Sequence, residues 1–254
     1  MERGIGMKLS VCMDALYKGR DFRESVNELK EIGYDTIEFW SWWQKDIEVV
    51  AAAVAEAGVS ISTFCTKFTS LVDPTKRSVY LEGLVESIEV AKRLNCTKLI
   101  SQVGQALEGV SREAQTQSLI EGLRACVPIL EKEGVTLLIE PLNTRVNHQG
   151  YFLASSEEAF HIINEVGSPY VKILFDIYHQ QITEGNVIAN IRENIGLIGH
   201  FHAAGNPGRH ELDNGELNYE QIFKAIDETG FEGHMGLEYF PLEEPQVGLR
   251  KLLK

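Results

Sequence analysis

Four polar residues stand near the ends of short apolar runs that are separated by helical stretches. The runs are VTLLIE with Glu140, VKILFD with Asp176, LIGHFHAAG with His202 and HMGLEY with Glu238. Apolar runs of this length between helical segments are typical of buried parallel strands. In a parallel barrel, catalytic residues come from the carboxyl ends of several different strands. We therefore expect these four side chains to meet at one mouth.

Eight such runs alternate with amphipathic segments along the chain. The predicted strands are Lys8–Met13, Thr36–Trp40, Ser60–Phe64, Lys98–Gln102, Val135–Glu140, Val171–Asp176, Ile198–Ala203 and Met235–Tyr239. Strict alternation favours a parallel sheet, and eight units favour a closed barrel over a doubly wound sheet, since no GxGxxG follows the first strand. The length of 254 residues matches one (β/α)8 barrel, which has roughly 250. We predict an α/β fold with a single TIM barrel domain over residues 1–254.

Start and stop signals bound several of the predicted helices. Three helices begin after a capping Asp or Ser and end at a glycine, over residues 21–33, 46–58 and 155–167. Two longer helices are predicted over Thr75–Leu94 and Ser111–Glu133. These signals agree with the alternation that the apolar runs indicate.

The net charge of −13 excludes several partners. A chain this acidic lacks the basic surface that nucleic acid or an anionic membrane requires. No apolar stretch approaches the roughly 20 residues of a membrane span, and no secretory signal opens the chain, so we expect a cytoplasmic protein. Met7 is an alternative start, which would make the first six residues an unstructured leader. The four cysteines form no CxxC pair and are expected to be reduced, buried thiols.

The residues at the strand ends offer carboxylate oxygens and one imidazole. This donor set suits Mg²⁺, Mn²⁺ or Co²⁺ better than an ion that prefers thiolates. Taken singly, each residue has an ordinary explanation, because a carboxylate can cap the next helix and a strand histidine is often hydrogen-bonded in the core. Their place at the same end of consecutive strands favours a joint role. We predict a divalent-metal site of Glu140, Asp176, His202 and Glu238.

Two further histidines lie close to this set in sequence. His200 has the same parity as His202 and should also point into the barrel, one layer deeper, where a structural hydrogen bond is favoured over a ligand role. His179 follows Asp176 in the segment FDIYH. We predict it in the loop after the sixth strand, where it could hydrogen-bond a substrate oxygen.

A long polar loop, AAGNPGRHELDNGELNY, follows the seventh strand. Its glycines and charges are typical of a loop that covers a substrate, and the alternative is a solvated connector. Arg209 is the residue in it best suited to hold a carboxylate or polarise a carbonyl. Near the second strand, Trp40 and Trp42 would share a side if the strand continued. With Trp43, they are expected to line the pocket, cover the mouth or pack on another subunit.

Four segments resemble the hydroxypyruvate isomerase family. They are IEPLN at 139–143, FDIYHQQ at 175–181, IGHFHAAGNPGRHELDNGELNY at 198–219 and GLEYFP at 236–241. That family is part of the xylose isomerase-like TIM barrels, together with the ketose 3-epimerases. The resemblance covers most of the chain, and its motifs are specific in the C-terminal half.

The resemblance implies a role for each candidate residue. The metal would be held by Glu140, Asp176, His202 and Glu238. Of these, Glu140 and Glu238 would also form the catalytic acid/base pair. His179 and Arg209 would contact substrate oxygens. Members of the isomerase family often carry Gln at the position of His202, where the imidazole instead resembles the sugar epimerases.

Two functions follow from this reading. The first is a metal-dependent isomerase that moves a carbonyl on a short hydroxy-oxo acid, such as hydroxypyruvate or an oxo-tetronate, by proton transfer through a cis-enediolate. The alternative is a ketose 3-epimerase acting on free sugars at the same site. The net charge opposes an endonuclease-like barrel acting on DNA, and the pair of glutamates opposes a non-catalytic sugar-binding barrel. The expected partner is a small sugar or hydroxy-oxo acid, and a homo-oligomer is left open.

Overall fold

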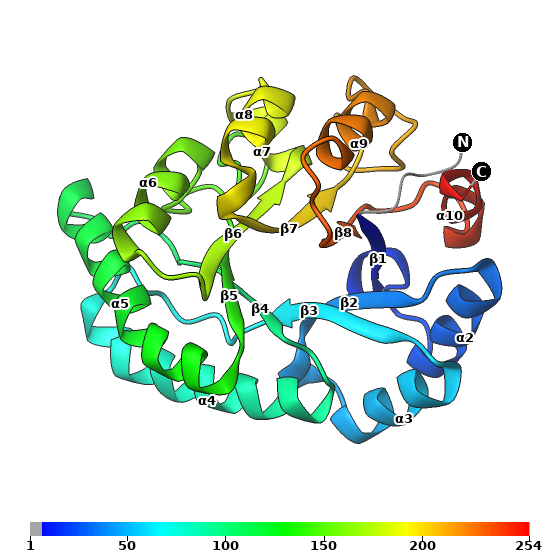
Figure 1. Ribbon diagram of the computed structural model, residues 1–254, viewed down its shortest axis with the longest axis horizontal. Helices are drawn as coiled ribbons and strands as arrows, with labels where there is room; N and C mark the ends of the chain where they lie inside the picture. The colour runs from blue at the N-terminus through cyan, green and yellow to red at the C-terminus, as the bar shows by residue number, and fades with distance from the viewer. Residues whose placement is uncertain (1–6, 254) are drawn as a thin grey trace.

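Eight parallel strands close into a barrel in residues 7–253, the part of the chain that this computed structural model describes (Figure 1). In chain order they are β1 (Lys8–Cys12), β2 (Thr36–Ser41), β3 (Ser60–Cys65), β4 (Lys98–Ser101), β5 (Thr136–Ile139), β6 (Val171–Asp176), β7 (Ile198–Ala203) and β8 (His234–Leu237). β1 also pairs with β8, with Val11 opposite Leu237, so the sheet closes on itself. Each predicted strand lies within two residues of an observed one, and the predicted (β/α)8 barrel is confirmed.

Helices connect successive strands and surround the barrel (Figure 1). They are α1 (Met13–Leu16), α2 (Phe22–Ile32), α3 (Ile47–Ala57), α4 (Arg77–Arg93), α5 (Arg112–Glu133), α6 (Ser156–Val166), α7 (Ile177–Thr183), α8 (Val187–Asn194), α9 (Tyr219–Asp227) and α10 (Pro245–Leu252). The two long predicted helices correspond to α4 and α5. The predicted leader, residues 1–6, lies outside the described residues, as does residue 254.

The predicted caps bound the helices as expected. Asp21 accepts the backbone N–H of Glu24 at 3.0 Å at the start of α2, and Ser155 opens α6 in the same way. Gly33 ends α2 with φ of +115°, a left-handed conformation in which glycine has no side chain to clash. The local signals therefore place the helix ends, and with them the strand ends that follow.

The main hydrophobic core lies between the strands and the helices that cover them. Leu29 on α2, Phe39 on β2 and Phe64 on β3 belong to it, and the two phenylalanine rings stack with centroids 5.1 Å apart. Burying one side chain of this size contributes about 1.5–3 kcal/mol to stability. This core therefore holds the surrounding helices against the outer face of the barrel.

A smaller apolar cluster lines the inside of the barrel. It consists of Cys65, Ile100, Leu138 and Leu174, which come from neighbouring strands. Leu138 and Leu174 precede Glu140 and Asp176 by two residues, so they point to the same side one layer deeper. The cluster therefore forms an apolar floor beneath the polar strand ends.

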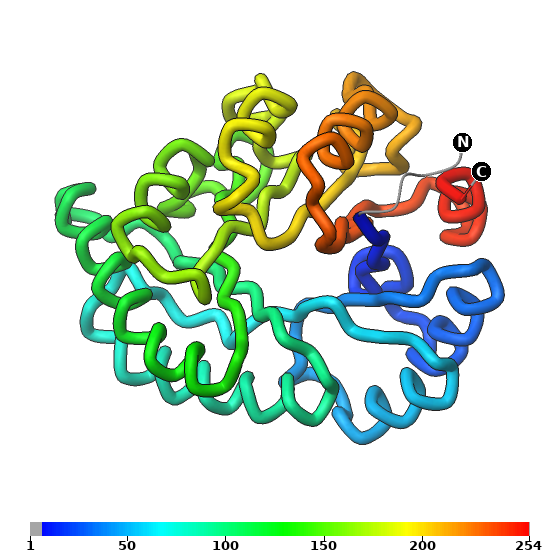
Figure 2. Tube along the Cα trace, viewed as in Figure 1, coloured from blue at the N-terminus to red at the C-terminus, as the bar shows by residue number. Residues whose placement is uncertain are grey.

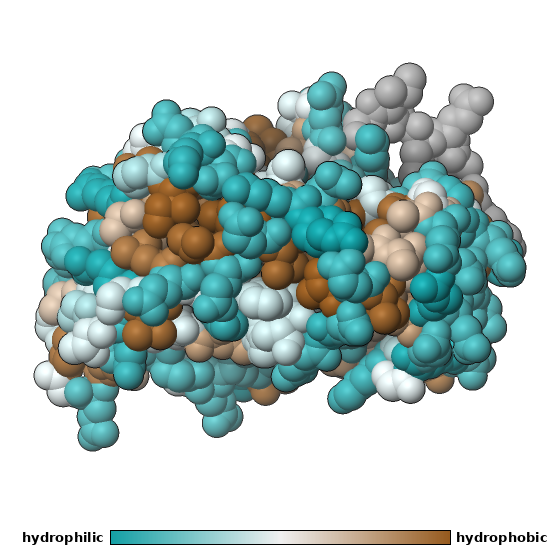
Figure 3. Space-filling view, turned by 90° about the horizontal axis from the view of Figure 1, so that it is seen from below, coloured by the Kyte–Doolittle hydropathy of each residue, from teal (hydrophilic) through white to brown (hydrophobic). Residues whose placement is uncertain are grey.

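The first and last strands lie side by side, as the blue and orange-red parts of the trace show in Figure 2. The face of the molecule in Figure 3 is mostly hydrophilic, with apolar side chains in separate patches. No helix within residues 7–253 is long and apolar enough to cross a membrane.

The four cysteines are buried and free. Burial raises the pKa of Cys96 and of Cys126 to about 12, so both remain protonated thiols.

Candidate active site

The structure brings the four predicted ligands together at the carboxyl ends of β5 to β8. Glu140 follows β5, Asp176 ends β6, His202 lies near the end of β7 and Glu238 follows β8. Each of these residues is at most 5% exposed. One possible ligand atom from each lies within 4.8 Å of the others. Their convergence is thus a feature of the fold, while their role as ligands stays a prediction.

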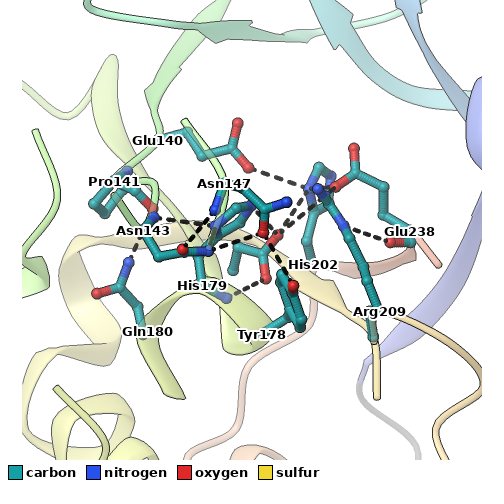
Figure 4. Close-up of polar contacts among 12 residues, drawn as sticks. Glu140, Pro141, Asn143, Asn147, Tyr178, His179, Gln180, His202, Arg209 and Glu238 are labelled. Atoms are coloured by element: carbon teal, nitrogen blue, oxygen red, sulfur yellow. Dashed lines mark hydrogen bonds and ion pairs between the residues drawn. The ribbon is translucent and has the colours of Figure 1, made fainter. Parts of the chain in front are cut away.

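His202 stands at the centre of this group (Figure 4). Its Nδ1 lies 3.4 Å from Glu140 Oε1 and 3.4 Å from Glu238 Oε2. Asp176 Oδ2 is 4.0 Å from the same nitrogen. This Nδ1 is buried and has no hydrogen-bond partner among the described residues. An imidazole nitrogen that faces three carboxylates is the donor set of a divalent cation, so the residues fit a bound metal ion.

The two glutamates differ in their affinity for a proton. Burial raises the pKa of Glu140 to about 7, and the charges of Glu238 and Asp176 act in the same direction. Burial would also raise the pKa of Glu238, but the positive charges of His202 and Arg209 outweigh it and hold that pKa well below its usual range. Two carboxyl groups whose environments separate their pKa values suit the roles of acid and base.

The raised pKa of Glu140 gives a prediction for metal binding. A ligand must lose its proton before it binds a cation, and Glu140 is mostly protonated below its pKa of about 7. The apparent affinity for Mn²⁺ should therefore rise with pH through neutrality, by up to about tenfold per pH unit for each displaced proton. Calorimetric titration with MnCl₂ in buffers of different ionisation enthalpy measures both quantities. An affinity independent of pH, with no proton release, would contradict the prediction.

His179 lies beside the cluster, with its side chain fully buried. It sits in the first turn of α7 rather than in a loop, because Asp176 accepts its backbone N–H at 3.1 Å and caps that helix. Its Nδ1 accepts the backbone N–H of Asn143 at 3.1 Å. Burial lowers the pKa of His179 to about 4, so the ring is neutral and carries its proton on Nε2. That Nε2–H has no hydrogen-bond partner within residues 7–253, which leaves it available to a substrate oxygen.

Arg209 reaches the cluster from the loop after β7 (Figure 4). Its Nη2 is ion-paired with Glu238 Oε2 and lies 3.7 Å from Asp176 Oδ2. The guanidinium also stacks over the rings of Tyr178 and Phe240, at 5.3 and 5.9 Å from their centroids. Sequence reasoning assigned Arg209 to a substrate carboxylate or carbonyl, and this role stays a prediction; in this structure its carboxylate partner is Glu238.

The loop that carries Arg209, residues 203–219, is fastened to the segment after β8. His210 Nδ1 lies 2.7 Å from the backbone oxygen of Phe240. Glu211 is 9% exposed, and its Oε1 accepts the backbone N–H of Leu242 at 3.0 Å. These contacts attach the loop to the end of β8, while its role in covering a substrate stays a prediction.

Comparison with known proteins places this geometry in a family. The model of the xylose isomerase-like TIM barrel matches residues 26–254. The chain belongs to that family.

Curated relatives in the family are isomerases. The chain is 30% identical to hydroxypyruvate isomerase of Escherichia coli, with 96% of this chain and 97% of the relative covered. It is 43% identical to 2-oxo-tetronate isomerase of Cupriavidus necator over 69% of this chain and 67% of the relative. A crystal structure named AP endonuclease, family 2, from Brucella melitensis superposes with a TM-score of 0.93 at 27% identity, covering 97% of this chain and 98% of that one.

One residue of the site in this family member escaped sequence reasoning. Glu38 on β2 lies inside the barrel, where its Oε2 is 3.0 Å from His200 Nε2. His200 is thus a buried, hydrogen-bonded residue, as predicted. Trp40, for which a place at the pocket was one of three expectations, donates its indole N–H to Glu238 Oε1 and so contacts the site. The signal for Glu38 was present, since it is the one acidic residue in the predicted strand Thr36–Trp40.

Trp42 does not share a side with Trp40. β2 ends at Ser41 and the chain turns into a short 3₁₀ segment, so the alternation of a strand stops there. Trp42 instead donates its indole N–H to Ser87 on α4 at 3.1 Å. Trp43, like Trp40, packs against the inner apolar cluster.

Proposed function

We propose that this chain is a metal-dependent isomerase that moves a carbonyl along a short hydroxy-oxo acid of the hydroxypyruvate or 2-oxo-tetronate type. One observation carries the proposal: three buried carboxylates surround Nδ1 of His202, and two of them, Glu140 and Glu238, each lie 3.4 Å from that nitrogen. The names of the curated relatives support the same reaction class. The metal is Mg²⁺ or Mn²⁺, with Co²⁺ also suited to these donors.

The ligands in this proposal are Glu140, Asp176, His202 and Glu238. A divalent cation bound there would stabilise the negative charge that develops on the substrate oxygens. The reaction itself needs one proton removed next to the carbonyl and one returned to the neighbouring carbon, through an enediolate of the substrate. Glu140 and Glu238 reach the site from β5 and β8, on either side of His202, and so can serve as the two proton carriers.

The remaining residues bind and orient the substrate. His179 offers its Nε2–H to a substrate oxygen, because its Nδ1 is already occupied by Asn143. Arg209 exchanges its contact with Glu238 for the substrate carboxylate, which releases Glu238 Oε2 for proton transfer. Trp40 keeps the other oxygen of Glu238 in place. Water is excluded by the apolar floor and by the loop that carries Arg209.

A second candidate is a ketose 3-epimerase, which would return the proton to the opposite face of the same carbon. It is favoured by one observation: Arg209 already has a carboxylate partner in Glu238 and does not require one from the substrate. The name of the Brucella structure raises a DNA-directed reaction, but a net charge of −13 opposes binding to a polyanion. A cytoplasmic location and a homo-oligomer stay predictions.

Substitution of Arg209 separates the two candidates. Loss of a charge-assisted contact costs roughly 1.5–3 kcal/mol, or about 10- to 150-fold in affinity. In an isomerase of oxo acids, Arg209→Ala should raise KM by that factor for acids and only slightly for uncharged ketoses. Arg209→Lys should recover little, because a point charge does not replace a bidentate fork.

The measurement is steady-state kinetics on paired acid and ketose substrates. Arg192→Ala is the matched control, since Arg192 pairs with Glu228 on the outside of the barrel. Equal losses on both substrate classes would contradict the carboxylate role and favour the epimerase. Activity on hydroxy-oxo acids that survives Arg209→Ala unchanged would remove Arg209 from the site.

A further inference from the structure

A fourth buried carboxylate touches the site from deeper in the barrel. Glu38 on β2 is 2% exposed, and its Oε1 lies 2.8 Å from His202 Nε2. Its Oε2 lies 3.0 Å from His200 Nε2 and accepts the hydroxyl of Ser62 on β3 at 3.1 Å. The carboxylate therefore joins β2, β3 and β7 inside the barrel, and one of its oxygens is in close contact with the histidine at the centre of the site.

The fold makes room for this carboxylate at Gly236. Gly236 pairs with His202 across β7 and β8, and a Cβ built on it would lie 2.2 Å from Glu38 Oε1. Its φ lies outside the left-handed region, so space rather than backbone conformation requires glycine at this position. Because Gly236 on β8 has no side chain, the carboxylate of Glu38 on β2 can occupy the space beside it.

Direct contacts among Glu38, His200 and His202 distinguish these three residues from a second metal site. Glu38, His200 and His202 have donor atoms close enough to be considered as ligands. However, His200 Nε2 is hydrogen-bonded to Glu38 Oε2 at 3.0 Å, and His202 Nε2 is in close contact with Glu38 Oε1 at 2.8 Å, so these side chains contact one another directly. The two ring nitrogens of His202 therefore face different partners: Nε2 faces Glu38, and Nδ1 faces Glu140 and Glu238.

We propose that Glu38 is a positioning residue of the metal site, which holds His202 by Nε2 so that the lone pair of Nδ1 points at the metal ligands Glu140, Asp176 and Glu238. The proposal rests on the metal site of the proposed function. The partner of one ring nitrogen fixes the tautomer and orientation of a histidine and so decides which nitrogen binds a metal. A carboxylate in that role also makes the imidazole a stronger ligand. Glu38 acts through His202 and does not itself touch the substrate.

The test is the affinity of the metal-free protein for Mn²⁺, measured by calorimetric titration. Glu38→Gln keeps the shape of the side chain and one acceptor oxygen but removes the charge. Loss of such a partner weakens metal binding by about 10- to 100-fold, and we expect a rise of that size in the Kd for Mn²⁺. At saturating Mn²⁺ the variant should regain most of its kcat, because the proton carriers are intact.

Ser10→Ala is the matched control. Ser10 is buried in the same layer and is hydrogen-bonded to Ser62 at 2.7 Å, but it does not contact His202 in any interaction that the structure shows. This variant should bind Mn²⁺ as tightly as the unmodified protein. If both variants lose affinity equally, Glu38 matters only for the core, and the positioning role is overturned.

Gly236→Ala provides a second route if Glu38→Gln does not fold. Its added methyl group displaces the Glu38 carboxylate without removing it, and the Kd for Mn²⁺ should rise again. A folded Glu38→Gln protein with an unchanged Kd would overturn the positioning role and leave the proposed function standing. If the unmodified protein binds no Mn²⁺, both the proposed metal site and the positioning role of Glu38 are contradicted.

Discussion

Glu140→Gln and Glu238→Gln should each lower kcat by at least about 100-fold, the loss expected when a general acid or base is removed. Glutamine preserves the shape of the side chain but cannot carry the proton. Both residues are buried beside His202, so neither role can pass to solvent. Because both are also candidate ligands, kcat is measured at saturating metal and the Kd for Mn²⁺ is determined separately.

The control for these variants is Glu243→Gln, which changes an exposed glutamate in the segment after β8. It should leave kcat and metal affinity unchanged. Thermal unfolding of each metal-free variant shows whether the barrel is intact. Near-normal turnover in a folded Glu140→Gln or Glu238→Gln protein would remove that residue from the proton-transfer steps.

Removal of the metal by EDTA should abolish turnover, and Mn²⁺, Mg²⁺ or Co²⁺ should restore it. A cation that stabilises developing charge contributes several kcal/mol, and each 1.36 kcal/mol is about tenfold in rate, so a loss of at least about 100-fold is expected. The ligand set that motivates this is one imidazole with three carboxylates, all buried. Elemental analysis before and after chelation establishes the metal content.

Metal binding should also be visible without catalysis. A ligand present at 100 times its Kd stabilises the folded state by about 2.7 kcal/mol. For a chain of this size, that corresponds to a rise in Tm of roughly 5–10 °C. A protein that is fully active when free of metal, and whose Tm does not respond to Mn²⁺, would contradict the metal-dependent mechanism.

The fold and the central residues were accessible from sequence for a physical reason. β6 and β7 are buried on both faces, so they read as continuous apolar runs, and their polar ends stand out as Asp176 and His202. The caps at Asp21 and Ser155 are local signals that need no knowledge of the rest of the chain. The strand ends and these two caps were therefore placed correctly, whereas the cap at Asp176 was missed and His179 was expected in a loop.

Contacts across the barrel were not accessible in the same way. Glu38 meets His202 from three strands away, and only the closed barrel brings the two together. The pairing of Arg209 with Glu238 depends on how a long loop folds back over the mouth. The departure of Trp42 depends on where β2 stops, which lies one residue beyond the end expected from its apolar run.

The most direct test of the proposed reaction is NMR of hydroxy-oxo acids and ketoses incubated in D₂O with the Mg²⁺-loaded protein. The account predicts that a hydroxy-oxo acid such as hydroxypyruvate is converted to the isomer with its carbonyl on the neighbouring carbon, and that deuterium enters at the carbon that receives the proton. Both changes should disappear after EDTA treatment and in the Glu238→Gln variant. Conversion of ketoses alone would favour the epimerase. The absence of conversion and exchange in every acid tested, or equal conversion by metal-free protein, would contradict the account.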